Sequence, residues 1–278
     1  MKNLTLIFTL LFGLSAIAFS FGQSTVEQQL EEIVSTYTDK IEQAVTLSSC
    51  GHAFDGPAAF VKQTENAWLD ALLYVTADYK KSIGREIYLK NKAQGKINNT
   101  HVSYAKTQEI LTALVKQTKR SGAMYRLNIL KSAEINAFAT LGGYLYVTTG
   151  LLNFVESYDE LAFIIGHEIA HEELKHTQRK VTKLTMYDYL NFSKLEKFGQ
   201  IAKGISGTLS PPFDQIDEYE ADRYGFYLAK NAGYNVSKFA DFFVKLERYE
   251  KKDIMKKLSS THPYASHRKK CVQTYISN

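Results

Sequence analysis

Hydrophobic residues recur at helical spacing over most of the chain, and this periodicity predicts a largely helical protein. Helices are expected over residues 25–50 and 57–95. The second stretch opens with Gly56-Pro57, and proline is well tolerated in the first turn of a helix. A further amphipathic helix is expected over residues 103–119.

The pattern changes to strict alternation in a short central region. Residues 125–129 alternate apolar and polar side chains, as a half-buried strand does. Residues 144–148, Tyr-Leu-Tyr-Val-Thr, are rich in strand-forming residues and follow Gly142-Gly143. Two strands are therefore expected among the helices.

A long helix is predicted to begin next to Ser157. Ser157 and Glu160 have the spacing of a capping box and precede an apolar run. We expect this helix to continue to about His176. Further helices are expected at about 180–203, 216–231, 236–256 and 264–276, and a loop over 204–215.

The first residues have the layout of an export signal. A positive start, Met1-Lys2-Asn3, is followed by an apolar run over residues 4–21 and by small residues where a signal peptidase would cut. The run is also just long enough to span a membrane, so an uncleaved anchor is the alternative. We expect a signal peptide at 1–22, a helical N-terminal extension at 23–100 and the functional domain at 101–278.

Composition narrows the class of protein. The chain has 278 residues, 45% of them hydrophobic and 23% charged, which is ordinary for a globular protein. The net charge of +5 comes without a basic stripe or binding motif, so we expect no nucleic-acid partner. Cys50 and Cys271 are the only cysteines; in an exported protein they could pair, and the sequence leaves open whether they do.

The strongest chemical signal is the sequence His-Glu-Ile-Ala-His at residues 167–171. On a helix, residues four apart lie on nearly the same face, so His167 and His171 can direct their imidazoles at one metal ion. Glu168 lies beside them. A zinc ion lowers the pKa of a bound water to about 7, and Glu168 can accept its proton during attack on a peptide carbonyl.

A catalytic zinc takes three protein ligands and a water. A third histidine at the metzincin spacing is absent, because residues 174 and 177 are Leu and Thr. The best remaining candidate is Glu218. It shares a helix face with Asp222, which we expect to accept a hydrogen bond from a ligand histidine.

These motifs together resemble the zinc metallopeptidase family that includes the CaaX prenyl proteases, HtpX and the periplasmic proteases of the BepA and LoiP type. Four blocks match in order over about residues 104–272. They are Asn136–Ala139 through Gly142-Gly143-Tyr144 to Gly150-Leu151-Leu152, Glu160 through His171, Glu218 with Asp222, and His262-Pro263 with Arg268.

The resemblance implies a gluzincin fold: an α+β protein, mainly helical, with a small sheet beside the active helix. It implies one zinc ion held by His167, His171 and Glu218, with Glu168 as the general base.

The resemblance also suggests three further roles. Gly142, Gly143 and Tyr144 could present an exposed strand edge to an extended substrate; the other interpretation is a tight turn that requires glycine. His262 could occlude the metal and keep the enzyme latent, or could be an ordinary loop histidine. Arg268 is expected to pair with an acid of the third block. His52, His101, His176 and His267 are interpreted as structural or exposed.

We expect a zinc-dependent endopeptidase of the periplasm or the extracellular space, acting on unfolded or misassembled exported proteins. The resemblance points to a compact exported member, without the membrane spans or tetratricopeptide array of some relatives. The alternative is a chaperone-like module that keeps the protease fold and holds clients. Polypeptides are the expected partners, and peripheral membrane contact and oligomeric state stay open.

Overall fold

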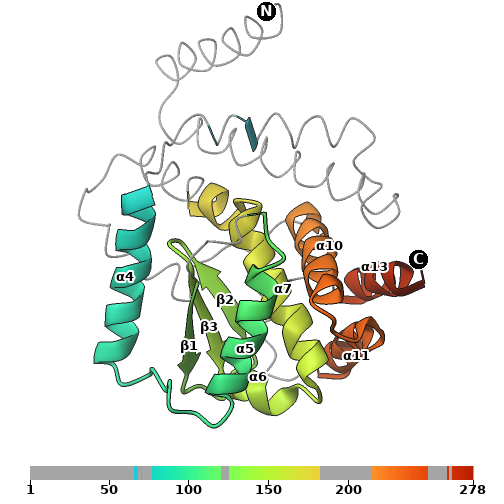
Figure 1. Ribbon diagram of the computed structural model, residues 1–278, viewed down its shortest axis with the longest axis horizontal. Coiled ribbons are helices and arrows are strands. Elements are labelled where there is room, and N and C mark those ends of the chain that lie inside the picture. The colour runs from blue at the N-terminus through green and yellow to red at the C-terminus, as the bar shows by residue number, and fades with distance from the viewer. Residues whose placement is uncertain are drawn as a thin grey trace, which may run out of the picture. The chain divides into compact units, whose positions relative to one another are not determined.

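A three-stranded sheet organises the part of the chain that carries the site (Figure 1). Its strands are β1 (Arg126–Leu130), β2 (Ala137–Thr140) and β3 (Tyr144–Thr148). β3 is central, parallel to β1 and antiparallel to β2, so β2 forms one edge of the sheet. The computed structural model describes residues 66–67, 70, 77–119, 125–181, 215–249, 262 and 265–277.

Two of the three strands match the sequence prediction. β1 and β3 lie where alternation and β-branched residues indicated them. β2 was not predicted, because the strand has only four residues, two of them alanine, and alanine has little strand preference. Gly142 and Gly143 join β2 to β3 with φ angles of 82° and 80°, which glycine adopts without strain.

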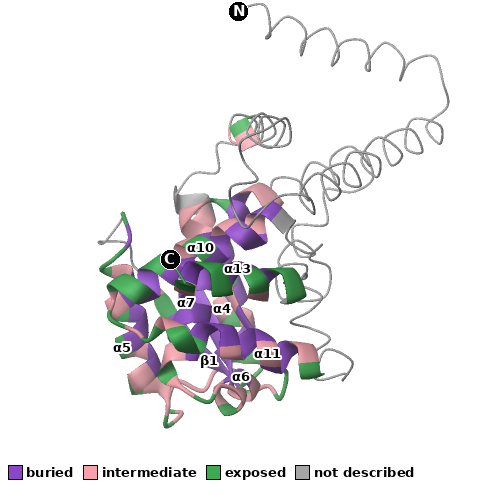
Figure 2. Ribbon diagram, turned by 90° about the vertical axis from the view of Figure 1, so that its right-hand side faces the viewer, coloured by how far each residue is buried: buried purple, intermediate pink, exposed green. Residues whose placement is uncertain are grey.

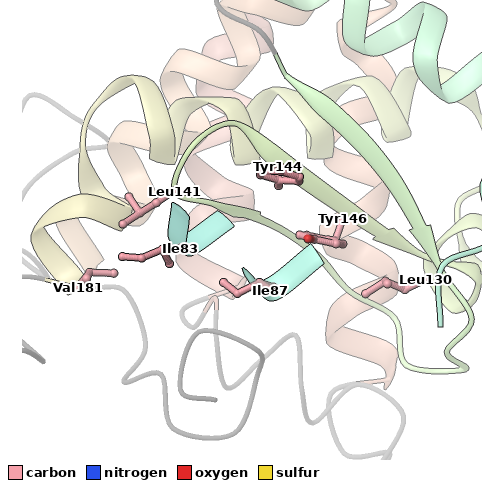
Figure 3. Close-up of a cluster of buried hydrophobic side chains, with 7 residues drawn as sticks. All are labelled: Ile83, Ile87, Leu130, Leu141, Tyr144, Tyr146 and Val181. Atoms are coloured by element: carbon pink, nitrogen blue, oxygen red, sulfur yellow. The ribbon is translucent and has the colours of Figure 1, made fainter. Parts of the chain in front are cut away.

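One face of the sheet packs on helix α4 (Ala77–Ala93). Ile83 and Ile87 of α4 meet Tyr144 and Tyr146 of β3 in a buried cluster (Figure 3). The cluster also contains Leu130, Leu141 and Val181. Residues upstream of 100 therefore share a hydrophobic core with the sheet.

Leu145 and Val147, which alternate with these tyrosines along β3, point to the opposite face and are fully buried. Helix α5 (Tyr104–Val115) contacts β1, and helix α7 (Tyr158–Glu173) contacts β2 and α5. The short helix α6 (Thr149–Phe154) continues directly from β3. Figure 2 shows that the interior formed by these elements is buried, whereas α5 and α13 expose their outer faces.

The C-terminal helices pack around α7. They are α10 (Gln215–Asn231), the 3₁₀ turn η3 (Val236–Lys238), α11 (Phe239–Tyr249) and α13 (Ala265–Ser277). Phe163 of α7 stacks on Phe239 at 5.1 Å between ring centroids and meets Phe243 edge-on at 5.7 Å. These aromatic contacts fix α11 against α7. Helices α10 and α13 match their predicted ranges to within one residue at either end, and α11 lies inside its predicted range.

Several expectations fall outside the described residues. The signal sequence, Cys50, the helix over 25–50, nearly all of the helix over 180–203 and residues 204–214 of the predicted loop belong to them. Residue 215, predicted as the end of that loop, instead begins α10, and the three-part division of the chain stays a prediction. Cys271 is buried and engaged in a disulfide. Among the described residues, no helix combines the length and the apolar character that a membrane span requires.

Candidate metal centre

Helix α7 carries the first part of the site. Its N-terminus is capped by Ser157, whose hydroxyl accepts a hydrogen bond from the Glu160 amide at 3.2 Å. Two turns further on, His167 and His171 bring their Nε2 atoms to 2.9 Å from each other. Both rings and Glu168 are buried. The four-residue spacing therefore places both imidazoles on the inner face of the helix.

The close approach of α10 to α7 brings Glu218 to these imidazoles. The two helices cross at Gly166 and Gly225, where an added Cβ on Gly225 would lie 2.6 Å from the backbone nitrogen of His167. This contact leaves room for no larger side chain. Glu218, fully buried, lies with Oε1 at 3.4 Å from His171 Nε2 and with Oε2 at 3.7 Å from His167 Nε2.

His262 completes the group from a different segment. Its Nδ1 lies 3.2 Å from His167 Nε2 and 3.1 Å from Glu218 Oε1, and its Nε2 lies 3.5 Å from Glu168 Oε1. Burial alone lowers the pKa of His262, but the carboxylates of Glu218 and Glu168 outweigh burial and raise it. The imidazole therefore lies where a metal ion would meet the other three side chains.

The donor set fits a tetrahedral zinc ion. Ligand atoms at about 2.0–2.1 Å from zinc lie roughly 3.3 Å from one another, and the three separations among His167, His171 and Glu218 bracket that value. Burial, followed by repulsion from His167, lowers the pKa of His171 well below its ordinary value, which favours the neutral ring that binds metal. Glu218 Oε2 is buried and accepts no aligned hydrogen bond from the described residues, so it retains a lone pair that could bind a metal.

Asp222 and Arg268 support His167 from behind. Asp222 Oδ1 lies 2.9 Å from His167 Nδ1, and Arg268 donates Nε–H and Nη2–H to the same carboxylate, each at 2.7 Å. Burial alone would raise the pKa of Asp222, but the Arg268 guanidinium outweighs burial and lowers it. Arg268 Nη1 also lies 2.5 Å from Glu218 Oε2, an ion pair without hydrogen-bond alignment. The carboxylates thus stay ionised in the interior.

Glu168 lies against the sheet edge. Its Oε2 accepts a hydrogen bond of 3.1 Å from the backbone N–H of Ala139 in β2. Burial raises the pKa of Glu168 above its ordinary value, although His262 and His167 oppose the shift. A carboxylate with a raised pKa is a better proton acceptor near neutral pH.

The segment Gly142-Gly143-Tyr144 does not form the exposed strand edge that was predicted for it. The two glycines form the turn between β2 and β3, and Tyr144 pairs on both sides in the central strand, with Arg126 and Thr140. It therefore offers no exposed edge, and the prediction of one there was wrong. A Cβ on Gly142 would lie 2.8 Å from the Lys80 carbonyl, so the alternative interpretation, a tight turn that requires glycine, is confirmed.

Sequence reasoning missed His176. A continuous helix would place residues 171 and 176 about 140° apart around its axis, at about 100° per residue. Helix α7 instead ends at Glu173, and Lys175 has a φ of 65° before the chain becomes helical again at 176. This break turns buried His176 back, so that its Nδ1 lies 3.1 Å from His171 Nδ1. A helix break after the motif was the missing signal.

The mainly helical fold with its small sheet, and the buried group of side chains that could hold a metal, are typical of zincin-like metallopeptidases. Residues 103–276 match the family model described as "Peptidase family M48", so the chain belongs to that family. The family confirms the fold class and the resemblance inferred from the four blocks.

Individual relatives are similar over parts of their length. The chain is 32% identical over 154 residues to "Metalloendopeptidase OMA1, mitochondrial" of Bos taurus, covering 49% of this chain and 29% of that protein. It is 29% identical over 156 residues to "Beta-barrel assembly-enhancing protease" of Yersinia pestis, covering 50% of this chain and 32% of that protein. The chain thus spans about a third of the length of these relatives, and the similarity concerns one part of each.

Proposed function

We propose that the protein is a zinc-dependent endopeptidase, in which His167, His171 and Glu218 hold one zinc ion and Glu168 is the general base. The observation that carries the proposal is the convergence of an acid on α10 with two imidazoles on α7 in a buried group able to hold a metal. A zinc ion there supplies a water of pKa about 7 and polarises the scissile carbonyl.

The protein's own side chains supply the remaining steps. Glu168 accepts the proton of the attacking water at a carboxylate oxygen and delivers it to the leaving amine. The Ala139 N–H holds that carboxylate in place through Oε2, which leaves Oε1 for proton transfer. Asp222 accepts from His167 Nδ1 and so directs Nε2 of the same ring at the metal.

Polypeptide substrates follow from the family, and the edge strand suggests how they bind. The Ala139 N–H points off the outer edge of β2, away from β3 and toward Glu168. An extended peptide added along this edge would pass beside the centre. Pairing through backbone hydrogen bonds favours unfolded chains over folded ones. We therefore propose unfolded or misassembled exported proteins as substrates, with the periplasm or extracellular space as the compartment.

His262 gives the proposed enzyme a latent state. Its Nδ1 lies within hydrogen-bonding distance of two proposed ligands, His167 and Glu218, so its side chain competes with water and substrate for the open coordination position. His262→Ala is expected to raise the rate of casein hydrolysis by the zinc-loaded protein. Equal rates for the variant and the wild type would remove the latency proposal.

Glu168→Gln tests the mechanism. The variant should retain zinc, measured by elemental analysis, and lose casein hydrolysis by about 10²–10⁴-fold, the range for a general base. Hydrolysis at the wild-type rate would contradict the assignment. A wild-type protein that binds casein but does not cleave it, with or without a chelator, would instead indicate the chaperone-like module.

A further inference from the structure

The two proposed ligand histidines are supported in different ways. His167 Nδ1 faces the carboxylate of Asp222, whereas His171 Nδ1 faces the imidazole of His176. The other nitrogen of that ring, His176 Nε2, lies 3.0 Å from Glu220 Oε2 and 3.6 Å from Asp217 Oδ1. A chain of contacts thus runs from His171 through a second ring to two acids on α10.

Proton accounting fixes the tautomers along this chain. A neutral histidine that binds metal through Nε2 carries its hydrogen on Nδ1. His171 therefore donates from Nδ1, and His176 must accept at its own Nδ1. His176 then carries its hydrogen on Nε2 and donates it to Glu220. Each nitrogen in the chain has one role, and the acids at its end favour that arrangement.

The same assignment of ring hydrogens argues against a second cation bound at His176. His176, Asp217 and Glu220 have the side-chain types of a metal site, and their ligand atoms lie close together. A cation on His176 Nε2 would move the ring hydrogen to Nδ1. Two N–H groups would then face each other across the 3.1 Å gap between His171 and His176. With zinc on His171, that arrangement is repulsive.

We propose that His176 is a positioning residue for the zinc centre. It accepts the His171 Nδ1–H, and the hydrogen bond that it donates to Glu220 holds its own ring in place. The inference rests on the proposed zinc site at His171. The backbone supports it, since the break at Lys175, a non-glycine residue with positive φ, is what directs His176 at His171. Positioning partners of this kind change metal affinity by about 10–100-fold.

Two substitutions at residue 176 test the role. His176→Phe keeps a ring of similar size without nitrogens and is expected to weaken zinc binding, measured by chelator competition, by about 10–100-fold. His176→Gln retains an acceptor and a donor and is expected to recover most of that loss. His267→Phe makes the same change at an exposed histidine on α13 and should leave zinc affinity at the wild-type value.

Loading with Co²⁺ provides a readout that a purely structural role would not move. The visible absorption of bound Co²⁺ should shift in His176→Phe and return toward the wild-type spectrum in His176→Gln. If His176→Phe fails to fold, Glu220→Gln must still weaken zinc binding, by a few-fold, for the proposal to stand.

The outcomes separate this inference from the proposed function. Unchanged zinc affinity in His176→Phe, beside a wild type that binds zinc and cleaves casein, would overturn the positioning role alone. Two ions per wild-type chain, with one lost on His176→Phe, would overturn it in favour of a second cation site. Weakened zinc binding in His176→Phe, even if Glu168→Gln still hydrolysed casein, would support positioning while the proposed mechanism failed.

Discussion

The two histidines of the proposed metal centre, His167 and His171, are supported by side chains of different kinds. On the His167 side, Asp222 and Arg268 form a buried, charged pair with two hydrogen bonds of 2.7 Å. On the His171 side, the imidazole of His176 lies between His171 and two acids, Glu220 and Asp217, whose side chains are 30% and 13% exposed. Electrostatic interactions are stronger where water is excluded, so the first side should be the stiffer one.

This difference shows that the two histidines of one helix motif can be held in place by interactions of unequal strength. The His167 side depends on α10 and α13, which are far apart in sequence, and on charges that the interior cannot leave unpaired. The His171 side depends on a local break after α7 and ends near solvent. Substitutions on the first side should therefore affect folding and metal binding together, and those on the second side chiefly metal binding.

The largest expected effect follows from Arg268→Met. The guanidinium lies between the buried carboxylates of Asp222 and Glu218, and its loss leaves two negative charges uncompensated. Removing one partner of a buried ion pair costs about 3–5 kcal/mol. Chemical denaturation of the metal-free protein measures this loss. A change below about 1 kcal/mol would show that the His167 side is not the charged, stiff half described above.

Gly225→Ala tests the helix crossing on which both sides depend. The added methyl meets backbone atoms of Gly166 and His167, so α10 must move away from α7. Alanine gains about 1 kcal/mol in helix propensity, but overpacking typically costs about 1–3 kcal/mol. We expect net destabilisation by denaturation and weaker zinc binding, because Glu218 moves with α10. Lys230→Ala, at an exposed position of the same helix, should stay within about 0.5 kcal/mol of wild type.

A matched pair of neutralising substitutions compares the two supports directly. Asp222→Asn removes the charge behind His167, and Glu220→Gln removes the charge at the end of the His176 chain. The first should weaken zinc binding by about 10–100-fold, and the second by only a few-fold, since Glu220 is partly solvated. Chelator competition measures both. A larger loss for Glu220→Gln would reverse the comparison.

The smallest effect concerns Asp70, which binds the segment carrying His176. Its carboxylate accepts from Arg179 Nε and Nη2, each at 3.1 Å, and lies 3.2 Å from Lys175 Nζ. Burial alone would raise the pKa of Asp70, but these two cations outweigh burial and lower it. The resulting stabilisation is present above the unfolded-state pKa of about 3.9 and is lost as the pH falls through the lower folded-state pKa.

Asp70→Asn should therefore destabilise the protein by up to about 1 kcal/mol at pH 7, as expected for a partly exposed ion pair. The difference between variant and wild type should shrink as the pH is lowered toward 3. A pH-independent difference in denaturation midpoint would show that the carboxylate charge does not hold this segment in place.

Sequence reasoning was most accurate where geometry is local. The ranges of β3 and α10 were predicted to within a residue at either end, and the Ser157 hydroxyl accepts the hydrogen bond that the capping signature predicted. It was weakest where a neighbour decides the outcome. β2 is a strand because β3 pairs with it, and the end of α7 came three residues before the predicted limit.

By itself, the sequence determined what lies on each helix: two imidazoles four residues apart on α7, and two acids at the same spacing on α10. Helical geometry repeats every 3.6 residues whatever surrounds it, so these local alignments need no tertiary information. Only the tertiary structure decided that the two helices touch at Gly166 and Gly225, and that a backbone break turns His176 toward the centre. Distances between elements depend on packing, which no short stretch of sequence contains.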